Sequence, residues 1–478
     1  MTQTNRPILK LPSRSAESVD EQVIVLDSID VLLPCRRFAV SFKVSERGSV
    51  SPTSEFLLRL LHAADGVLEA DIASFFGFNQ RELSFVLEEV TSRDYVSRSN
   101  GQAWLTASGQ SLFLEDQQSP AIYAVEKRTE SVSFDLLSLC PVDLRGLSVF
   151  AMKLDELPVL DVEIVANARQ RVPKAFWTHF SELFLASDRK LANKKPTLYS
   201  IDNVVAGDRF STIVPITVTA TTGRPHAAEA DLSHWREAQQ LEDRYTVVES
   251  VTAFMETLKV SKRPDDIQGY QLLTKWAPDF LREFIRRDGL AVERYFHAAG
   301  TRAGELRSDR PTVPLLGTLF TPANNERLHN AVRYALERSA NKPLIAEIQW
   351  IVPEVRWGHT RVLPATLNSI ERLLFPEPSG DAEPQRVSAT AITRNPLPRY
   401  LAEAFDHHQF LAEQAAIAPA VEVFIIPDLV CAVLVHAPIK ANNGIPVPLG
   451  FLSFDASVVQ RVAEDLGKIA ARETPTGQ

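Results

Sequence analysis

The stretch Ser51-Pro-Thr-Ser-Glu-Phe-Leu-Leu-Arg-Leu-Leu-His62 opens the part of the chain whose fold can be read most directly. Its apolar residues recur at helical spacing after a serine that can cap a helix. A second short helix is expected from Glu69 to Phe76, closed by Gly77, and a third from Asn79 to Val90. Asn100-Gly101 then stands at the tip of an expected hairpin, because this dipeptide favours a type I′ turn.

Further details of this segment point to one small domain. Asp71 or the nearby Glu69 can cap the second helix. The expected buried stripe of the third helix consists of Leu83, Val86, Leu87 and Val90. The closing Leu105-Thr-Ala-Ser-Gly-Gln-Ser-Leu-Phe113 is similar to the LT-x-x-G tail that follows the wing in MarR-like regulators. Residues 51–116 therefore resemble a winged helix-turn-helix, which is a very large superfamily.

This resemblance implies that the N-terminal part of the third helix contacts DNA. The side chains that would face bases or phosphates are Asn79, Gln80, Arg81 and Ser84 on the helix and Arg93, Arg98 and Asn100 on the wing. Asn, Gln and Arg can make the bidentate base contacts that direct readout needs.

The charge of the same segment favours a protein partner instead. From Ser51 to Asp116, four arginines stand against ten carboxylates, a net charge of −6, and the whole chain carries −9. Non-specific DNA affinity comes mostly from phosphate neutralisation, which this segment is poorly equipped to supply. A winged helix can also dock a protein, which needs no positive field. Both DNA and a protein remain candidate partners, and the sequence specifies no oligomeric state.

Length and composition set the broad class. A chain of 478 residues is too long for one ordinary core, so two or three domains are expected. No apolar stretch approaches the roughly 18–20 residues that cross a bilayer, and the first residues lack the apolar part of a signal peptide. Cys35, Cys140 and Cys431 have no paired spacing. We expect a soluble, cytoplasmic protein with no membrane partner, metal site or cofactor.

The patterning predicts a mixed α+β and α/β multidomain fold, with an N-terminal winged helix followed by a mixed α/β body. The expected parts are an N-terminal extension (1–50), the winged helix (51–116), a mixed strand and helix domain (121–318) and an α/β domain (319–470). Within the body, Val159–Val165 is expected to be a strand, Arg310–Pro322 a connector and Arg399–Gln414 a helix.

A second candidate surface for nucleic acid lies at residues 169–195. Seven basic residues stand there against two acidic ones, a net charge of +5. The basic residues are Arg169, Arg171, Lys174, Arg189, Lys190, Lys194 and Lys195. Interleaved aromatic rings suit a single-strand or backbone-binding surface. The alternative is a core-facing helix, because Phe176, Phe180 and Phe184 recur at four-residue spacing.

The sequence offers little for enzyme chemistry. No Walker A, Gly-x-Gly-x-x-Gly or Gly-x-Ser-x-Gly motif occurs. Three runs, Val421–Ile426, Cys431–His436 and Leu449–Phe454, resemble very weakly the strand layout of a phospholipase D half. The resemblance implies a phosphodiesterase with His436 in its site. However, His436 and Lys440 have the wrong spacing, and the Gly-Ser pair is missing.

The other polar cluster, Glu354-Val-Arg-Trp-Gly-His-Thr-Arg361, follows a predicted strand. Strand ends in α/β folds commonly hold ligand groups. We therefore name Glu354, Arg356, His359, Arg361 and, from the last sheet, His436 as a candidate anion site. The alternative is a salt-bridged loop with Trp357 packed beneath it.

Two functions follow from these patterns. The first is a non-enzymatic winged-helix protein that acts as a DNA-binding or assembly subunit of a larger complex. The second is a phosphodiesterase or nuclease-like α/β enzyme positioned by the winged helix, either active or a degenerate phospholipase D-like form.

Overall fold

The computed structural model describes residues 22–47, 50–113, 120, 123–185, 197–235, 242–287, 289–301, 304–339, 347–375, 387–411 and 417–470. The chain divides into two compact units. The larger unit comprises Met1–Cys35, Asp135–Val165 and Arg209–Gln478, and the smaller unit comprises Arg36–Phe134 and Ala166–Asp208. The helices and sheets confirm the expected mixed α+β multidomain class. The four consecutive ranges expected from the sequence stay a prediction.

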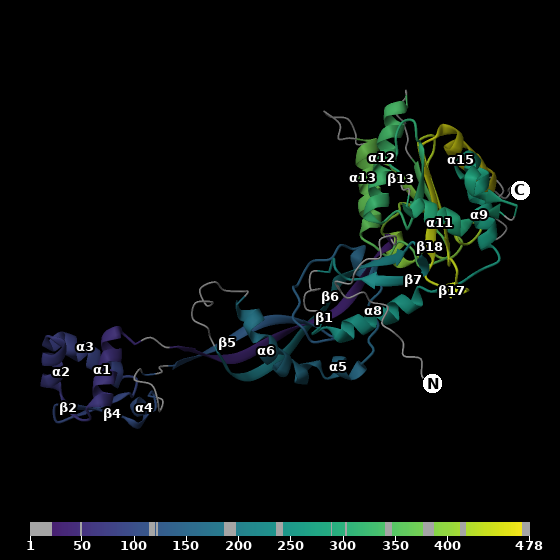
Figure 1. Cartoon of the computed structure of the whole chain (residues 1–478). Helices are drawn as coiled ribbons and strands as arrows, with labels where there is room; N and C mark the ends of the chain where they lie inside the picture. Colours follow the sequence, from purple (N-terminus) through teal and green to yellow (C-terminus); the bar gives the residue numbers. More distant parts are fainter. Residues whose placement is uncertain are drawn as a thin grey trace, which may run out of the picture. The chain divides into compact units, whose positions relative to one another are not determined.

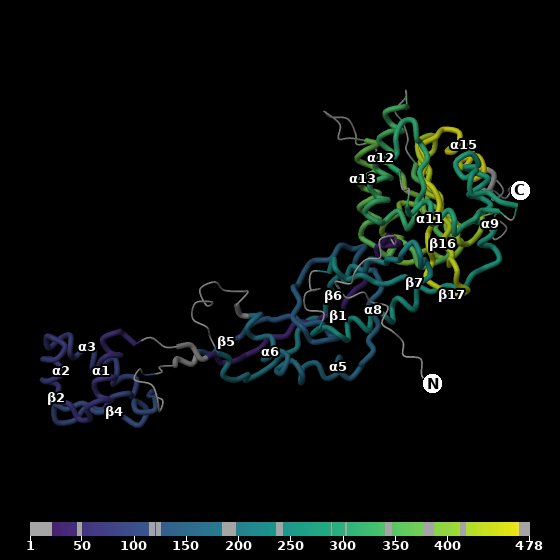
Figure 2. The backbone as a smooth tube through the Cα atoms, viewed as in Figure 1, coloured from purple at the N-terminus to yellow at the C-terminus, as the bar shows by residue number. Residues whose placement is uncertain are grey.

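The smaller unit contains a module of short helices and a small sheet, which we call the 51–113 module. Its helices are α1 (Pro52–Ala63), α2 (Glu69–Phe76), α3 (Gln80–Thr91) and α4 (Ala107–Gln110). Its strands β2 (Val67–Leu68), β3 (Val96–Ser99) and β4 (Gln102–Leu105) form a sheet of order β2-β4-β3. In Figure 2, α1, α2 and α3 lie together above β2 and β4.

The interior of the module follows the predicted helical stripe. Val86, Leu87 and Val90 of α3 are buried against Leu57 and Leu61 of α1, whereas Leu83 is only partly buried. The predicted cap of α2 is wrong. Leu68 occupies the N-cap position, and no side chain of the described residues caps this helix. Glu69 and Asp71 instead lie in its first turn, where a negative charge is favourable beside the helix dipole.

Long strands form the second sheet. These are β1 (Val23–Arg47), β5 (Tyr123–Asp135), β6 (Thr197–Thr221) and β7 (Arg224–Asp231), in the order β5-β1-β6-β7. Helix α6 (Ala168–Leu185) belongs to the smaller unit and α8 (Tyr245–Thr257) to the larger. The strand predicted at Val159–Val165 is wrong, because α5 (Val162–Ala166) occupies this position.

A seven-stranded sheet forms the centre of the larger unit. Its order is β11-β18-β16-β15-β12-β13-β14. The strands are β11 (Thr312–Leu316), β12 (Glu347–Ile351), β13 (Ser388–Thr393), β14 (His407–Phe410), β15 (Val421–Ile426), β16 (Val430–Ala437) and β18 (Val447–Ser453). The β12–β13 and β13–β14 pairs are parallel, and the other four pairs are antiparallel.

Helices cover both faces of this sheet, so its central strands are buried throughout. On one face, α12 (Pro322–Arg338) and α13 (Val362–Leu374) run side by side (Figure 1). Their apolar residues join Phe424, Leu434 and Leu452 in one core. The opposite face packs against α9 (Asp266–Trp276), α11 (Val292–Thr301) and α15 (Ala456–Ala470). No helix of the described residues is long and apolar enough to span a membrane.

Short elements complete the larger unit. They are α10 (Pro278–Leu281), α14 (Arg399–Ala402), the strand pairs β8 (Val260–Ser261) with β17 (Asn443–Gly444) and β9 (Ile285–Arg286) with β10 (Gly289–Leu290), and 3-10 turns at Ala151–Lys153 and Arg282–Phe284. Two predictions are wrong here. The expected connector Arg310–Pro322 contains β11. The expected helix Arg399–Gln414 is described as far as Leu411, and this part forms the short α14 followed by β14.

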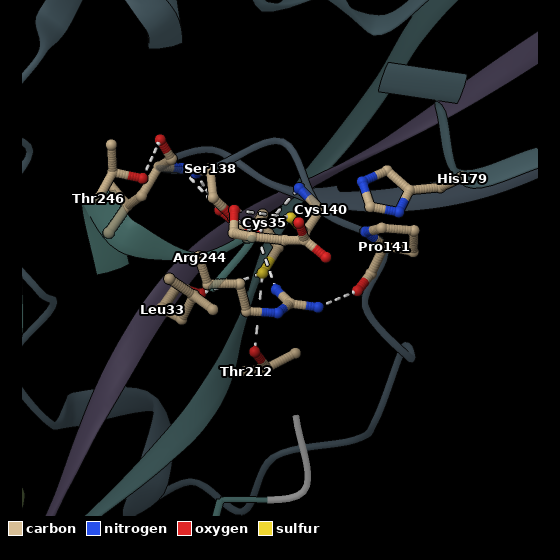
Figure 3. A network of polar contacts seen from close by, with 12 residues as sticks. Leu33, Cys35, Ser138, Cys140, Pro141, His179, Thr212, Arg244 and Thr246 are labelled. Carbon is tan, nitrogen blue, oxygen red and sulfur yellow. Dashed lines mark hydrogen bonds and ion pairs between the residues drawn. The ribbon is translucent and has the colours of Figure 1, made fainter. Parts of the chain in front are cut away.

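A fully buried ion pair joins the end of β5 to the start of α8 (Figure 3). Arg244 donates from Nη1 to Asp135 Oδ2 at 2.8 Å and from Nη2 to the carbonyl oxygen of Pro141 at 2.6 Å. Asp135 also accepts hydrogen bonds from Ser138 and from the backbone amides of Leu137 and Cys140. Because every carboxylate oxygen is hydrogen-bonded, this buried charge is well compensated.

Candidate functional site

A capping box fixes the start of α3 in the 51–113 module. Asn79 Oδ1 accepts hydrogen bonds from the backbone amides of Arg81 and Glu82, both at 3.0 Å. Glu82 Oε2 accepts in return from the Asn79 amide at 2.9 Å. This reciprocal pair satisfies amides that would otherwise lack an intrahelical partner. The predicted helix start is confirmed, and the side-chain oxygen of Asn79 is occupied by the cap.

The predicted hairpin is also confirmed. Strands β3 and β4 pair from Val96↔Leu105 to Ser99↔Gln102, which leaves Asn100 and Gly101 as the two turn residues. Both have positive φ angles, 51° and 73°. This combination is what a type I′ turn requires.

Several side chains predicted to contact DNA form hydrogen bonds or ion pairs within the module instead. Arg98 donates from Nε and Nη2 to the two carboxylate oxygens of Glu69, both at 2.8 Å. Ser84 Oγ donates to the carbonyl oxygen of Gln80 at 2.8 Å. The remaining predicted residues of the module, Gln80, Arg81, Arg93 and Asn100, are exposed. Arg81 and Arg93 are therefore the exposed arginines among these predicted residues for which the described part of the chain shows no ion pair.

Large aromatic rings are exposed on the same helices. Phe75 of α2 is 71% exposed and Phe85 of α3 is 69% exposed. The Phe75 ring packs edge-on against Phe76, with centroids 4.9 Å apart. Exposed phenylalanines of this size on neighbouring helices are typical of a surface that another protein covers.

In the basic segment, the aromatic stripe of α6 faces the interior. Phe176 and Phe180 are buried and pack on Phe42 of β1, with ring centroids 4.9 and 5.9 Å apart. Arg169 Nε donates to the carbonyl oxygen of Val204 at 3.0 Å, while Arg171 and Lys174 are exposed. The predicted residues Arg189, Lys190, Lys194 and Lys195, and the side chain of Phe184, lie outside the described residues. The core-facing alternative is confirmed for the two described rings of the stripe.

A cavity lined by charged residues lies in the larger unit, at the C-terminal ends of the parallel strands β12 and β13. Its volume is about 670 Å³, and its lining includes Glu354, Arg356 and His359, three residues of the predicted anion site. Trp357 and Tyr400 form an apolar part of the wall and are both buried. The Tyr400 hydroxyl donates to the carbonyl oxygen of Trp357, which holds the two rings in place.

Ion pairs organise the charged wall of this strand-end cavity. Arg356 Nη1 lies 2.7 Å from Asp155 Oδ2. Glu354 lies between two arginines, with Arg263 Nη1 at 3.4 Å and Arg394 Nε at 3.7 Å. The salt-bridged loop weighed as the alternative is therefore present, and it lines a cavity.

His359 is buried in the same wall. Its Nε2 lies 3.6 Å from Asp155 Oδ2, and its ring packs on Tyr400 with centroids 4.2 Å apart. Burial lowers the pKa of His359 more strongly than Asp155 raises it. At neutral pH this imidazole is therefore uncharged, and it contributes a polar atom but no positive charge to the cavity.

The structure does not bring the other two predicted residues into this cavity. Arg361 binds Asp30 of β1, with its Nη2 3.2 Å from Oδ1. His436 Nε2 lies 2.6 Å from Glu422 Oε2, and both side chains are buried. Glu422 also accepts from Trp350 Nε1 at 2.9 Å. Lys440, the other residue of the weak phospholipase D resemblance, lies 3.3 Å from Glu293.

Sequence reasoning missed several residues of the cavity. Lys153, Asp155, Arg263, Arg394 and Arg399 line it from three separate segments of the chain. Arg394 could have been found, because it follows β13 at the same sheet edge as Glu354. The others lie in loops and short helices whose neighbours only the tertiary structure determines.

Among the residues that the structure describes, no group of three or more His, Cys, Asp or Glu side chains could hold a metal ion. Comparison with known proteins gives no relative for either unit: no protein-family model, no curated protein and no solved structure matches the chain.

Proposed function

We propose that the chain is a non-enzymatic assembly subunit whose 51–113 module is a winged helix that docks a protein partner. The order of three helices followed by the β3–β4 hairpin supports the interpretation of this module as a winged helix. The observation that carries the docking role is the exposure of Phe75 and Phe85 on α2 and α3. These are the helices that would approach DNA in a DNA-binding relative.

Charge supports the same choice. Residues 51–113 hold four arginines against eight carboxylates, a net charge of −4. Two of the four arginines are paired, Arg98 with Glu69 and Arg59 with Glu55 at 2.6 Å. A surface of this kind repels a phosphate backbone and attracts a basic protein surface. The expected partner therefore offers an apolar pocket for the two phenylalanine rings and a basic rim around it.

A binding assay with purified full-length protein separates a protein partner from DNA. We expect labelled duplex DNA to show no fluorescence anisotropy change at physiological salt, with Arg81→Ala indistinguishable from the wild type. If the wild type binds duplex with a steep salt dependence that Arg81→Ala or Lys174→Ala weakens, DNA is the partner. Hydrolysis of a generic phosphodiester that His436→Ala abolishes would contradict the non-enzymatic role.

The docking surface itself is tested by capture from cells that produce the chain. The double variant Phe75→Ser/Phe85→Ser is compared with the wild type and with Phe410→Ser, a control at a phenylalanine that is 57% exposed in the larger unit. A protein retained by the wild type and the control is then purified and titrated calorimetrically. We expect the double variant to lose at least tenfold in affinity for it, because central aromatic anchors dominate interface energetics. Equal affinity for the double variant would exclude this surface.

A further inference from the structure

The strand-end cavity has the location and size of a small-molecule site. It lies beyond the C-terminal ends of β12 and β13, where ligands bind in open α/β sheets. Its volume of about 670 Å³ falls within the range of roughly 300–1,000 Å³ that ligand pockets occupy. Every residue that lines it belongs to the larger unit.

The cavity concentrates positive charge in a chain of net negative charge. Five cations line it against the two carboxylates Asp155 and Glu354, which leaves a net charge of +3. The cations are Lys153, Arg263, Arg356, Arg394 and Arg399. The carboxylates are already paired with Arg263, Arg356 and Arg394. Lys153 and Arg399 are exposed and form no ion pair with any described residue.

Two buried ring nitrogens of the same wall lack partners. His359 Nδ1 and Trp357 Nε1 are inaccessible to solvent and have no hydrogen-bond partner among the described residues. Native structures satisfy most buried polar atoms, so each exception calls for an explanation. Both atoms belong to residues that line the strand-end cavity.

We propose that the strand-end cavity binds an organic phosphate, a small molecule with two or more negative charges on phosphate groups and a neutral remainder. Planar guanidinium groups match phosphate oxygens in pairs, and four arginines line the cavity. The cavity is larger than a phosphate group alone requires, and the wall of Trp357 and Tyr400 suits the neutral remainder of the ligand. This site is independent of the docking surface of the 51–113 module.

The experiment is calorimetric titration of the full-length protein with four probes. ADP carries a base and a diphosphate, fructose 1,6-bisphosphate carries a sugar between two phosphates, pyrophosphate has no neutral remainder, and citrate carries carboxylates in place of phosphates. We expect ADP or fructose 1,6-bisphosphate to bind at least tenfold more tightly than pyrophosphate and citrate. Whichever of the two binds identifies the neutral remainder as a nucleoside or a sugar.

Variants assign the binding to this cavity. Arg399→Ala and Lys153→Ala remove exposed cations that hold no structural ion pair, so we expect both proteins to fold and each to bind about tenfold more weakly. Arg372→Ala is the matched control, an exposed arginine of α13 that does not line the cavity. Far-ultraviolet circular dichroism confirms that each variant is folded.

Three results would overturn the proposal. The first is a folded wild-type protein that binds neither organic phosphate at millimolar concentration. The second is citrate or pyrophosphate bound as tightly as the better organic phosphate. The third is affinity that Arg399→Ala and Lys153→Ala leave unchanged. Failure of protein docking at Phe75 and Phe85 leaves these three results unaffected, so the two proposals fail separately.

Discussion

Arg244 and Asp135 form a buried ion pair on which we expect the stability of the larger unit to depend. Both are fully buried, and together they fix the chain between β5 and α8. Arg244 also lies over the Trp235 ring, 5.3 Å from its centroid. Neither residue stands out in the sequence, because an arginine and an aspartate 109 positions apart carry no pattern that pairs them.

We predict that Arg244→Met lowers the free energy of unfolding of the larger unit by about 3–5 kcal/mol. The reason is that the variant leaves the Asp135 carboxylate buried without its cation. Urea unfolding followed by tryptophan fluorescence measures the change. Arg372→Met, at an exposed position of α13, is the control and stays within about 0.5 kcal/mol of the wild type. An equally small effect of Arg244→Met would show that the buried pair contributes little.

Asp27 provides a prediction about pH. Burial raises the pKa of Asp27 from 3.8 to about 6, against the lowering effect of its hydrogen bond from Thr318. The folded state therefore binds this proton more tightly than the unfolded state does. The contribution of this protonated carboxyl to the free energy of unfolding is complete below about pH 4. It is lost as the pH rises through about 6.

We predict that Asp27→Asn removes this loss. The amide oxygen can still accept from Thr318 Oγ1 and from the Ser28 amide, which both bond to Asp27 Oδ1 at 2.8 Å. The variant and the wild type should be equally stable near pH 4, and the variant more stable by roughly 1–3 kcal/mol at pH 7. Unfolding curves in urea at several pH values test this. Two parallel pH profiles would contradict it.

At the scale of elements, helix α3 depends on its capping box. We predict that Asn79→Ala destabilises α3 by about 1 kcal/mol, because it removes the acceptor for two backbone amides. Hydrogen exchange with mass spectrometry should show faster exchange in residues 80–91. Asn79→Asp retains the acceptor and should restore protection. Ser97→Ala, exposed on β3, serves as the control for the module. Equal protection in Asn79→Ala and the wild type would argue against a role for the cap.

The elements that the sequence predicts well are those whose signals are local. The start of α3 and the β3–β4 turn depend on residues within a few positions of each other, Asn79 with Glu82 and Asn100 with Gly101. In α5 two local signals oppose each other, and the signal for a helix prevails over the signal for a strand. Its β-branched residues favour a strand, whereas Asp161 Oδ1 accepts from the amides of Glu163 and Ile164 and starts a helix.

Long-range pairing explains the other errors. His407–Phe410 forms β14 because it pairs in parallel with Thr390–Thr393 of β13. Thr312–Leu316 forms β11 beside β18, and Pro314 is tolerated there because β11 is an edge strand. The candidate anion site divides for the same reason. Glu354, Arg356 and His359 lie at the strand end, whereas Arg361 forms an ion pair with Asp30, which is 331 positions away in the sequence.

At the scale of the whole molecule, charge is distributed unevenly. The chain carries −9, the 51–113 module −4, and the lining of the strand-end cavity +3. The charge of each local surface therefore determines which ligands or partners it attracts. The net charge of the whole chain describes neither the 51–113 module nor the strand-end cavity. An anionic ligand is attracted only close to the cavity, since exposed charges are screened over about 8–10 Å at physiological ionic strength.

The three cysteines provide the larger unit with natural sites for thiol-specific labelling. Cys35, Cys140 and Cys431 are all buried in this unit, and burial raises the pKa of each thiol. Only a thiolate reacts quickly with alkylating reagents or disulfide dyes. We predict that the native protein reacts at none of the three positions, while the chain in denaturant reacts at all three. Prompt labelling of the native protein would contradict this burial.

Because the smaller unit contains no cysteine, labelling kinetics report opening of the larger unit alone. Cys35 and Cys140 lie beside the Arg244 network, and Cys431 lies in the central sheet, so mass spectrometry of labelled peptides would time these two regions separately. The natural thiols thus allow the unfolding of the larger unit to be followed in the intact chain without introducing cysteines by mutation.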